Sequence, residues 1–206
     1  PVWSADGRRL AYSLTDGSVQ LIDAQVGKPS RRLVDFEQHP SVLAWSADGR
    51  RLAVGGWDPS PSPDSEITIV DVDSGKVLAR WRAGDRIDRA TFSPDGTRLA
   101  VRNVGKAVWS IAIWDWQKKE SVAVIGGEQG VFGFDWSPDG RTIAVGRTGR
   151  IEFWNLDAAR VDGELDIDQP QVVVWSPDGR RIAAANHGWL DRVDHLFVGE
   201  RESGDR

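Results

Sequence analysis

Cysteine and methionine are absent from the 206-residue sequence, which also contains only three histidines and a single tyrosine. The lack of cysteine excludes disulfide bonds, thiolate metal ligands and a cysteine nucleophile. No apolar run approaches the roughly 18 residues that a membrane-spanning helix needs, and no signal-peptide pattern opens the chain. We therefore expect no membrane segment and a cytoplasmic location.

Positive charge is also in short supply, because 31 acidic residues outnumber 26 basic ones and give a formal net charge of −5. This balance argues against nucleic acid or an anionic membrane as the main partner. The motifs of common enzymes are missing too: there is no Gly-x-Ser-x-Gly nucleophile elbow and no phosphate-binding Gly-x-x-x-x-Gly-Lys loop. The sequence therefore predicts a non-catalytic protein with no cofactor and no metal.

What the sequence has in abundance is repetition. A motif of the form aromatic-Ser-(Pro/Ala)-Asp-Gly starts at Trp3, Trp45, Phe92, Trp136 and Trp175, and each copy continues into Leu-Ala or Ile-Ala. The starting positions are 42, 47, 44 and 39 residues apart. Repeats of about 40–45 residues that contain several short strands are typical of the blades of a β-propeller.

Each repeat is predicted to form four strands; in the second repeat they cover residues 42–45, 51–54, 67–72 and 77–81. The motif residues favour a tight turn, since Pro presets its own φ, Asp caps the backbone and Gly adopts a positive φ. Strands such as 111–114 and 171–175 are apolar on both faces, which predicts sheets stacked between two neighbouring sheets. The predicted fold is an all-β propeller of about five four-stranded blades.

Residues 1–206 are predicted to be a single propeller segment with incomplete blades at both ends. The first repeat begins on its inner strand, and the last runs after about residue 198 into a polar tail that cannot serve as an apolar outer strand. The chain also begins with Pro1 instead of Met. We expect a piece of a larger bacterial multidomain protein, with its ring closed by further blades or by another chain.

The repeats resemble those of the WD40 family. Trp114-Asp115 and Trp154-Asn155 stand where that family ends its third strand, and the Ser-Pro-Asp-Gly turn follows the inner strand. The Gly-His pair that usually precedes the inner strand is missing, and the Trp-Ser-Pro-Asp-Gly form is also similar to TolB-type periplasmic repeats. The resemblance implies a seven-bladed ring that acts as a protein-interaction or sensing scaffold. The alternative is an accessory propeller of an enzyme, such as a serine-peptidase gate, or a TolB-like periplasmic module.

In such a propeller the repeated turns share one rim, where we expect their Asp and Arg charges to be compensated locally; a phosphate-binding ring is the alternative. Irregular loops lie on the opposite rim, where binding residues concentrate. Two loops stand out there, the proline-rich 57–65 and the stretch 186–195 with its apolar Trp-Leu tip. The candidate residues for binding a protein or peptide partner on this rim are Trp57, Asp58, Asp64, His39, Arg86, Lys106, Gln129, Arg147, Asp168, His187 and Trp189.

Two residue sets have plainer interpretations. The histidines and aspartates of 187–195 fit no standard metal-ligand spacing, so we predict no metal there. The tryptophans of the repeated motif are expected to pack between blades, and Trp114 and Trp154 are expected to belong to strand cores. For a third group we favour strand edges over a binding box. The motif group comprises Trp3, Trp45, Trp136 and Trp175, and the third group comprises Trp81, Trp109 and Trp116.

Overall fold

The computed structural model describes residues 1–25, 28–36, 39–57, 65–84, 86–105, 109–126, 130–186 and 196–200, with the backbone alone at 28–30, 39 and 57. Every regular element in these ranges is a β-strand, which confirms the predicted all-β class. The described residues contain no helix that is long and apolar enough to cross a membrane. By its internal contacts the chain divides into two compact units, Pro1–Ile125 and Gly126–Arg206.

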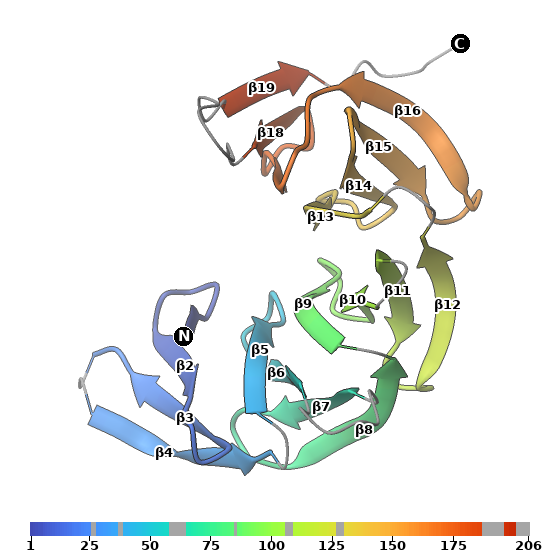
Figure 1. Cartoon of the computed structure of the whole chain (residues 1–206). Helices are drawn as coiled ribbons and strands as arrows, with labels where there is room; N and C mark the ends of the chain where they lie inside the picture. Colours follow the sequence, from blue (N-terminus) through green and yellow to red (C-terminus); the bar gives the residue numbers. More distant parts are fainter. Residues whose placement is uncertain are drawn as a thin grey trace. The chain divides into compact units, whose positions relative to one another are not determined.

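The first unit contains three antiparallel four-stranded sheets, and each sheet is built from strands that follow one another along the chain (Figure 1). The first sheet comprises β1 (Val2–Trp3), β2 (Arg9–Ser13), β3 (Ser18–Asp23) and β4 (Lys28–Asp35). The second comprises β5 (His39–Trp45), β6 (Arg51–Trp57), β7 (Ser65–Asp71) and β8 (Val77–Gly84). The third comprises β9 (Arg86–Phe92), β10 (Arg98–Val104), β11 (Trp109–Asp115) and β12 (Glu120–Ile125).

The second unit contains one four-stranded sheet and one sheet with three strands in its described part. The fourth sheet comprises β13 (Phe134–Trp136), β14 (Thr142–Arg147), β15 (Arg150–Asn155) and β16 (Arg160–Asp166). The fifth comprises β17 (Val172–Trp175), β18 (Arg181–Ala185) and β19 (Leu196–Glu200). The predicted polar tail after the third strand, residues 201–206, lies outside the described residues.

The repeated motif forms the same turn in all five sheets. Its Ser hydroxyl donates to the Asp carboxylate two residues later at 2.5–2.6 Å. The same hydroxyl accepts the backbone N–H of the residue five positions later, at 2.9–3.0 Å. The motif Gly has φ between +66° and +70° in every copy, a region that side chains disfavour. The predicted turn chemistry is therefore confirmed.

The second sheet is buried on both faces, as the apolar strand pattern predicts. Alternate residues of a strand point to opposite faces. On β6, Leu52 and Val54 pack with residues of the first sheet, and Ala53 packs with residues of the third. Burial of a Leu or Val side chain contributes about 1.5–3 kcal/mol, so the stacked faces hold the unit together.

The second unit uses the same stacking between its two sheets. Ile151 and Phe153 of β15 pack with Val173 and Trp175 of β17 in one apolar cluster. The backbone N–H of Trp175 also donates to the carboxylate of Asp135, at 2.9 Å. The two sheets are thus joined by a dry core and by a hydrogen bond between their inner strands.

The motif tryptophans of the first two sheets differ in burial. The indole N–H of Trp45 donates to the carbonyl of Val2 at 3.0 Å, so this tryptophan packs against the preceding sheet, as expected. Trp3 occupies the same place in the first sheet but is 56% exposed. Trp81 lies on the edge strand β8 and Trp116 directly follows β11, but both side chains are buried, and the Trp81 ring lies 5.7 Å from that of Trp114.

Candidate functional site

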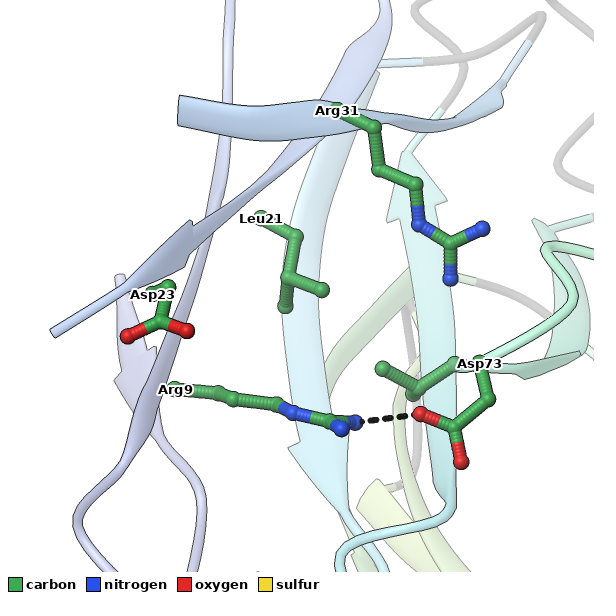
Figure 2. A pocket seen from close by; sticks show the side chains of 6 residues that line it. Arg9, Leu21, Asp23, Arg31 and Asp73 are labelled. Atoms are coloured by element: carbon green, nitrogen blue, oxygen red, sulfur yellow. Dashed lines mark ion pairs between the residues drawn. The ribbon is translucent and has the colours of Figure 1, made fainter. Parts of the chain in front are cut away.

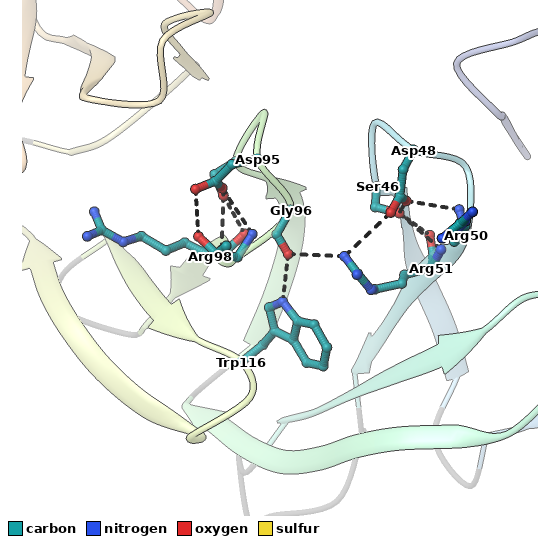
Figure 3. A network of polar contacts seen from close by, with 10 residues as sticks. Ser46, Asp48, Arg50, Arg51, Asp95, Gly96, Arg98 and Trp116 are labelled. Atoms are coloured by element: carbon teal, nitrogen blue, oxygen red, sulfur yellow. Dashed lines mark hydrogen bonds and ion pairs between the residues drawn. The ribbon is translucent and has the colours of Figure 1, made fainter.

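The aspartate of each repeated turn accepts a hydrogen bond from the serine of the same turn. In the second sheet the Asp48 carboxylate accepts the Ser46 hydroxyl at 2.5 Å and the backbone N–H of Arg50 at 3.0 Å (Figure 3). Equivalent hydrogen bonds lower the pKa of Asp6, with the Ser4 hydroxyl as the largest influence. The carboxylates of these turns are thus satisfied locally, as the sequence led us to expect.

One arginine next to the repeated turns joins two sheets. Arg51, at the start of β6, donates to the carbonyl of Gly96 in the third sheet at 3.4 Å, and the Trp116 indole N–H donates to the same carbonyl at 2.9 Å (Figure 3). The Arg51 guanidinium carbon lies 5.4 Å from the centroid of the Trp116 ring. The arrangement is a cation–π contact that closes the space between the second and third sheets.

Most of the predicted partner-binding residues cannot be placed. His39 and Trp57 are described by their backbone alone, at the start of β5 and the end of β6. Arg86 and Asp168 are exposed, at the start of β9 and after β16. The remaining predicted residues other than Arg147, namely Asp58, Asp64, Lys106, Gln129, His187 and Trp189, lie outside the described residues.

Arg147 is a correction, because its side chain is buried instead of standing on a rim. Its guanidinium forms an ion pair with Glu152 at 2.7 Å and donates to the carbonyl of Gly126 at 3.1 Å. Glu152 also accepts hydrogen bonds from Arg150 at 2.8 Å and from the Trp154 indole at 2.9 Å. The β14–β15 hairpin closes back on itself and removes Arg147 from any surface that a partner could reach.

A pocket of about 340 Å³ lies between the first and second sheets. The first sheet lines it with Arg9, Leu21, Asp23 and Arg31, and the segment after β7 lines it with Val72 and Asp73. Arg9 reaches across to Asp73 in an ion pair of 2.8 Å, and Arg31 extends from β4 toward the same space (Figure 2). The pocket therefore has an aliphatic floor and charged walls.

Sequence reasoning did not single out these pocket residues. Arg9 belongs to the predicted turn charges, Val72 to the predicted strand 67–72 and Asp73 to the hairpin turn that follows it, and Arg31 has no predicted role. The available signal was a difference between repeats: Arg31 pairs with Leu21 where Ala79 pairs with Ile69 one repeat later.

The fifth sheet has a buried face and an open apolar face. Strand register aligns Val172 of β17 with Leu196 of β19, and Val174 with Val198, across the alanines of β18. These four side chains are 42–77% exposed. Among the described sheets of its unit, only the fourth packs against this strand, and it covers one of the two faces. Elsewhere in the part of the chain that the structure describes, no group of three or more His, Asp or Glu residues is placed to hold a metal ion.

Comparison with known proteins identifies the repeat and the fold. Residues 119–155, from the turn before β12 to the end of β15, match the family model described as WD domain, G-beta repeat. The β-propeller domain of Cps50 (Swd1) from Myceliophteria thermophila superposes with a TM-score of 0.75 at 17% identity. Hydrazine synthase from Kuenenia stuttgartiensis superposes with a TM-score of 0.73 at 24% identity. No curated protein sequence matches the chain.

The superpositions cover nearly all of this chain but only part of each solved chain. The superpositions include 100% and 98% of this chain but only 66% and 62% of the two solved chains. The chain thus spans about two thirds of the length of these two solved chains. The predicted β-propeller fold is confirmed, and residues 119–155 match the WD40 repeat that the sequence resembles.

Proposed function

We propose that this WD40-repeat propeller is a non-catalytic scaffold that binds other protein surfaces. The observation that carries the proposal is the open face of the fifth sheet, with its two apolar rows, Val172–Leu196 and Val174–Val198. Contiguous apolar side chains on a rigid sheet favour burial against protein. Covering four such side chains would contribute several kcal/mol, at about 25 cal/mol per Å² of apolar surface.

The occupant that fits this face is another sheet of the same kind. The second sheet shows the arrangement when it is complete, since both of its faces pack against sheets of this chain. The longer propellers that the chain matches supply a second argument. Further blades, or a blade of another chain, would cover the face and close a ring, which the WD40 resemblance implies has seven blades.

A photo-crosslinking amino acid in place of Val198 tests this assignment. We expect crosslinks to strand residues of another chain. Crosslinks that form only within one polypeptide of the uninterrupted gene product would instead show that further blades of the same protein cover the face. The same amino acid in place of Val124, which is 63% exposed on the outer strand β12, is the matched control. Equal yields from the two positions would show that the open face is merely solvated and would remove the basis of the proposal.

The loop-bearing rim is proposed as a second binding surface, on the basis of its tryptophans in the sequence. Replacement of Trp57 and Trp189 by Ala is expected to leave the melting temperature unchanged and to weaken partner binding. A loss of folding would instead assign both residues to the core. Location in the cytoplasm is part of the same proposal.

The alternative, a propeller that serves an enzyme, is supported by the likeness to hydrazine synthase. Each form of this alternative requires a particular motif elsewhere in the gene, outside residues 1–206. A serine-peptidase gate requires a nucleophile elbow and a histidine further along the gene, and a TolB-like module requires a signal peptide. The sequence of the uninterrupted gene distinguishes the three.

A further inference from the structure

We propose that the pocket between the first and second sheets binds a single carboxylate of a protein partner, with Arg31 as the principal donor. The inference rests on the proposed scaffold function, and it assigns to that scaffold a binding site and a ligand chemistry. It is argued from the difference between two consecutive sheet interfaces of the same unit.

The two interfaces are built from equivalent positions. Val72 follows Asp71 at the end of β7, as Trp116 follows Asp115 at the end of β11. Between the second and third sheets, the Trp116 indole fills the space, is 5% exposed and belongs to the same apolar cluster as Ala79. Between the first and second sheets the shorter Val72 leaves that space open.

The opposite wall changes in the complementary direction. Arg31 on β4 pairs with Leu21, and the equivalent position on β8 is Ala79, paired with Ile69. At the interface of the second and third sheets, the small Ala79 packs in one cluster with the large Trp116. At the interface of the first and second sheets, the long side chain of Arg31 lines the pocket with the smaller Val72. The pocket of about 340 Å³ is the result of these two exchanges.

Arg31 is the donor that the pocket leaves available. Arg9 is paired with Asp73 at 2.8 Å, and Asp23 accepts the backbone N–H of Gln25 at 2.9 Å. Within the described part of the chain no hydrogen bond or ion pair joins the Arg31 guanidinium to another residue, although its charge is among the influences that lower the pKa of Asp71. Figure 2 shows the guanidinium extended toward the space beside Asp73. The fixed Arg9–Asp73 pair forms one wall and Arg31 forms the other.

The charges and the size of the pocket favour a carboxylate. A guanidinium binds a carboxylate through two parallel N–H donors. Asp23 and Asp73 in the lining repel a dianion such as phosphate more strongly than a monoanion. The volume is at the small end of ligand pockets, which start at about 300 Å³. The aliphatic contact for the methylenes of a glutamate side chain is Leu21, which is 5% exposed, whereas Val72 is fully buried beneath the pocket.

The test uses blocked tripeptides and nuclear magnetic resonance of the folded chain. We expect Ac-Ala-Glu-Ala-NH₂ to shift the Arg31 Nε–H signal and the Leu21 and Val72 methyl signals saturably, and Ac-Ala-Gln-Ala-NH₂ to leave them unchanged. Ac-Ala-Ala-Ala with a free carboxyl terminus and sodium propionate separate a side-chain carboxylate from a chain terminus and from a free acid. Equal shifts with the Glu and Gln peptides, or binding by propionate alone, would overturn the proposal.

Two substitutions locate the binding. Val72→Trp copies the neighbouring interface and should fill the pocket, and Arg31→Gln removes the donor; each is expected to weaken the Glu peptide by roughly tenfold or more. Arg32→Gln is the matched control, because Arg32 follows on the same strand but pairs with Asp35 at 2.5 Å. Should Val72→Trp fail to fold, Arg31→Gln decides, and unchanged affinity in it refutes the assignment. Crosslinking from position 198 reports on the scaffold proposal independently.

Discussion

Arg147 and Glu152 form an ion pair of 2.7 Å in which both side chains are less than a tenth exposed. Equivalent positions on the third strands of the other sheets hold Gln20, Thr68, Ala112 and Phe197, so the acid is specific to the fourth sheet. The pair is tolerated because the remaining lone pairs of the carboxylate accept donors from Arg150 and Trp154. An ion pair therefore holds the β14–β15 hairpin at a position where the other sheets have neutral side chains.

Removal of the acid should be far more damaging than removal of a surface charge. Glu152→Ala removes the buried counter-charge of Arg147, whereas Arg150 keeps Glu164 at 3.6 Å. The substitution is expected to lower the free energy of unfolding by about 3–5 kcal/mol. Asp35→Ala, which breaks an exposed pair with Arg32, should cost about 1 kcal/mol or less. Urea unfolding of both variants checks the difference, and similar midpoints would contradict the buried pair.

The stability of the fold should fall in acid, in part through Glu152. Burial, the largest single influence, raises the pKa of Glu152, but hydrogen bonds from Trp154, Arg147 and Arg150 outweigh it and hold the pKa below its usual value. A carboxyl with a lowered folded-state pKa contributes stability above its unfolded pKa and loses it as the pH falls through the folded one. Unfolding free energies measured from pH 7 down to pH 3 should decline more steeply than in Glu152→Gln, and parallel curves would exclude this contribution.

The repeated glycine should resist substitution for reasons of backbone alone. Gly140 has φ of +70°, so Gly140→Ala is expected to cost about 1–2 kcal/mol. Gly163 in β16 provides the comparison, because its φ is not positive and an added Cβ would lie 3.6 Å from the Phe153 ring, an ordinary contact. Gly163→Ala should be neutral or slightly stabilising in thermal unfolding. Equal losses at both sites would contradict the turn assignment.

The serine of the turn should matter most where it is buried. Ser137 accepts the buried backbone N–H of Thr142 at 2.9 Å, so Ser137→Ala leaves that donor unpaired at a cost of about 1–3 kcal/mol. Ser176 makes the same bond to Arg181 at an exposed turn, where water can replace the hydroxyl. Melting temperatures should therefore fall for Ser137→Ala and change little for Ser176→Ala; the reverse order would be inconsistent with the burial of the fourth turn.

The repeated turns and strands were predictable because their causes are local. Ser, Asp and Gly at fixed spacing determine a turn whatever surrounds it, as the near-identical φ values of Gly49 and Gly140 show. The alternation of apolar residues likewise placed Leu52 and Ala53 on opposite buried faces. From this information the all-β class and the stacked sheets follow without coordinates.

Burial and pairing between sheets were decided only by the tertiary structure. Trp3 and Trp45 share a motif, yet Trp3 is exposed and Trp45 donates to a carbonyl of the preceding sheet. The sequence placed Arg147 on the loop-bearing rim, but in the structure its side chain is buried and forms an ion pair with Glu152, five residues away. The sequence by itself determined the repeating unit, since its turns and strands depend on neighbours along the chain. Which side chains meet across the stack, and where Val72 leaves a space that Trp116 fills, depends on neighbours that only the folded chain supplies.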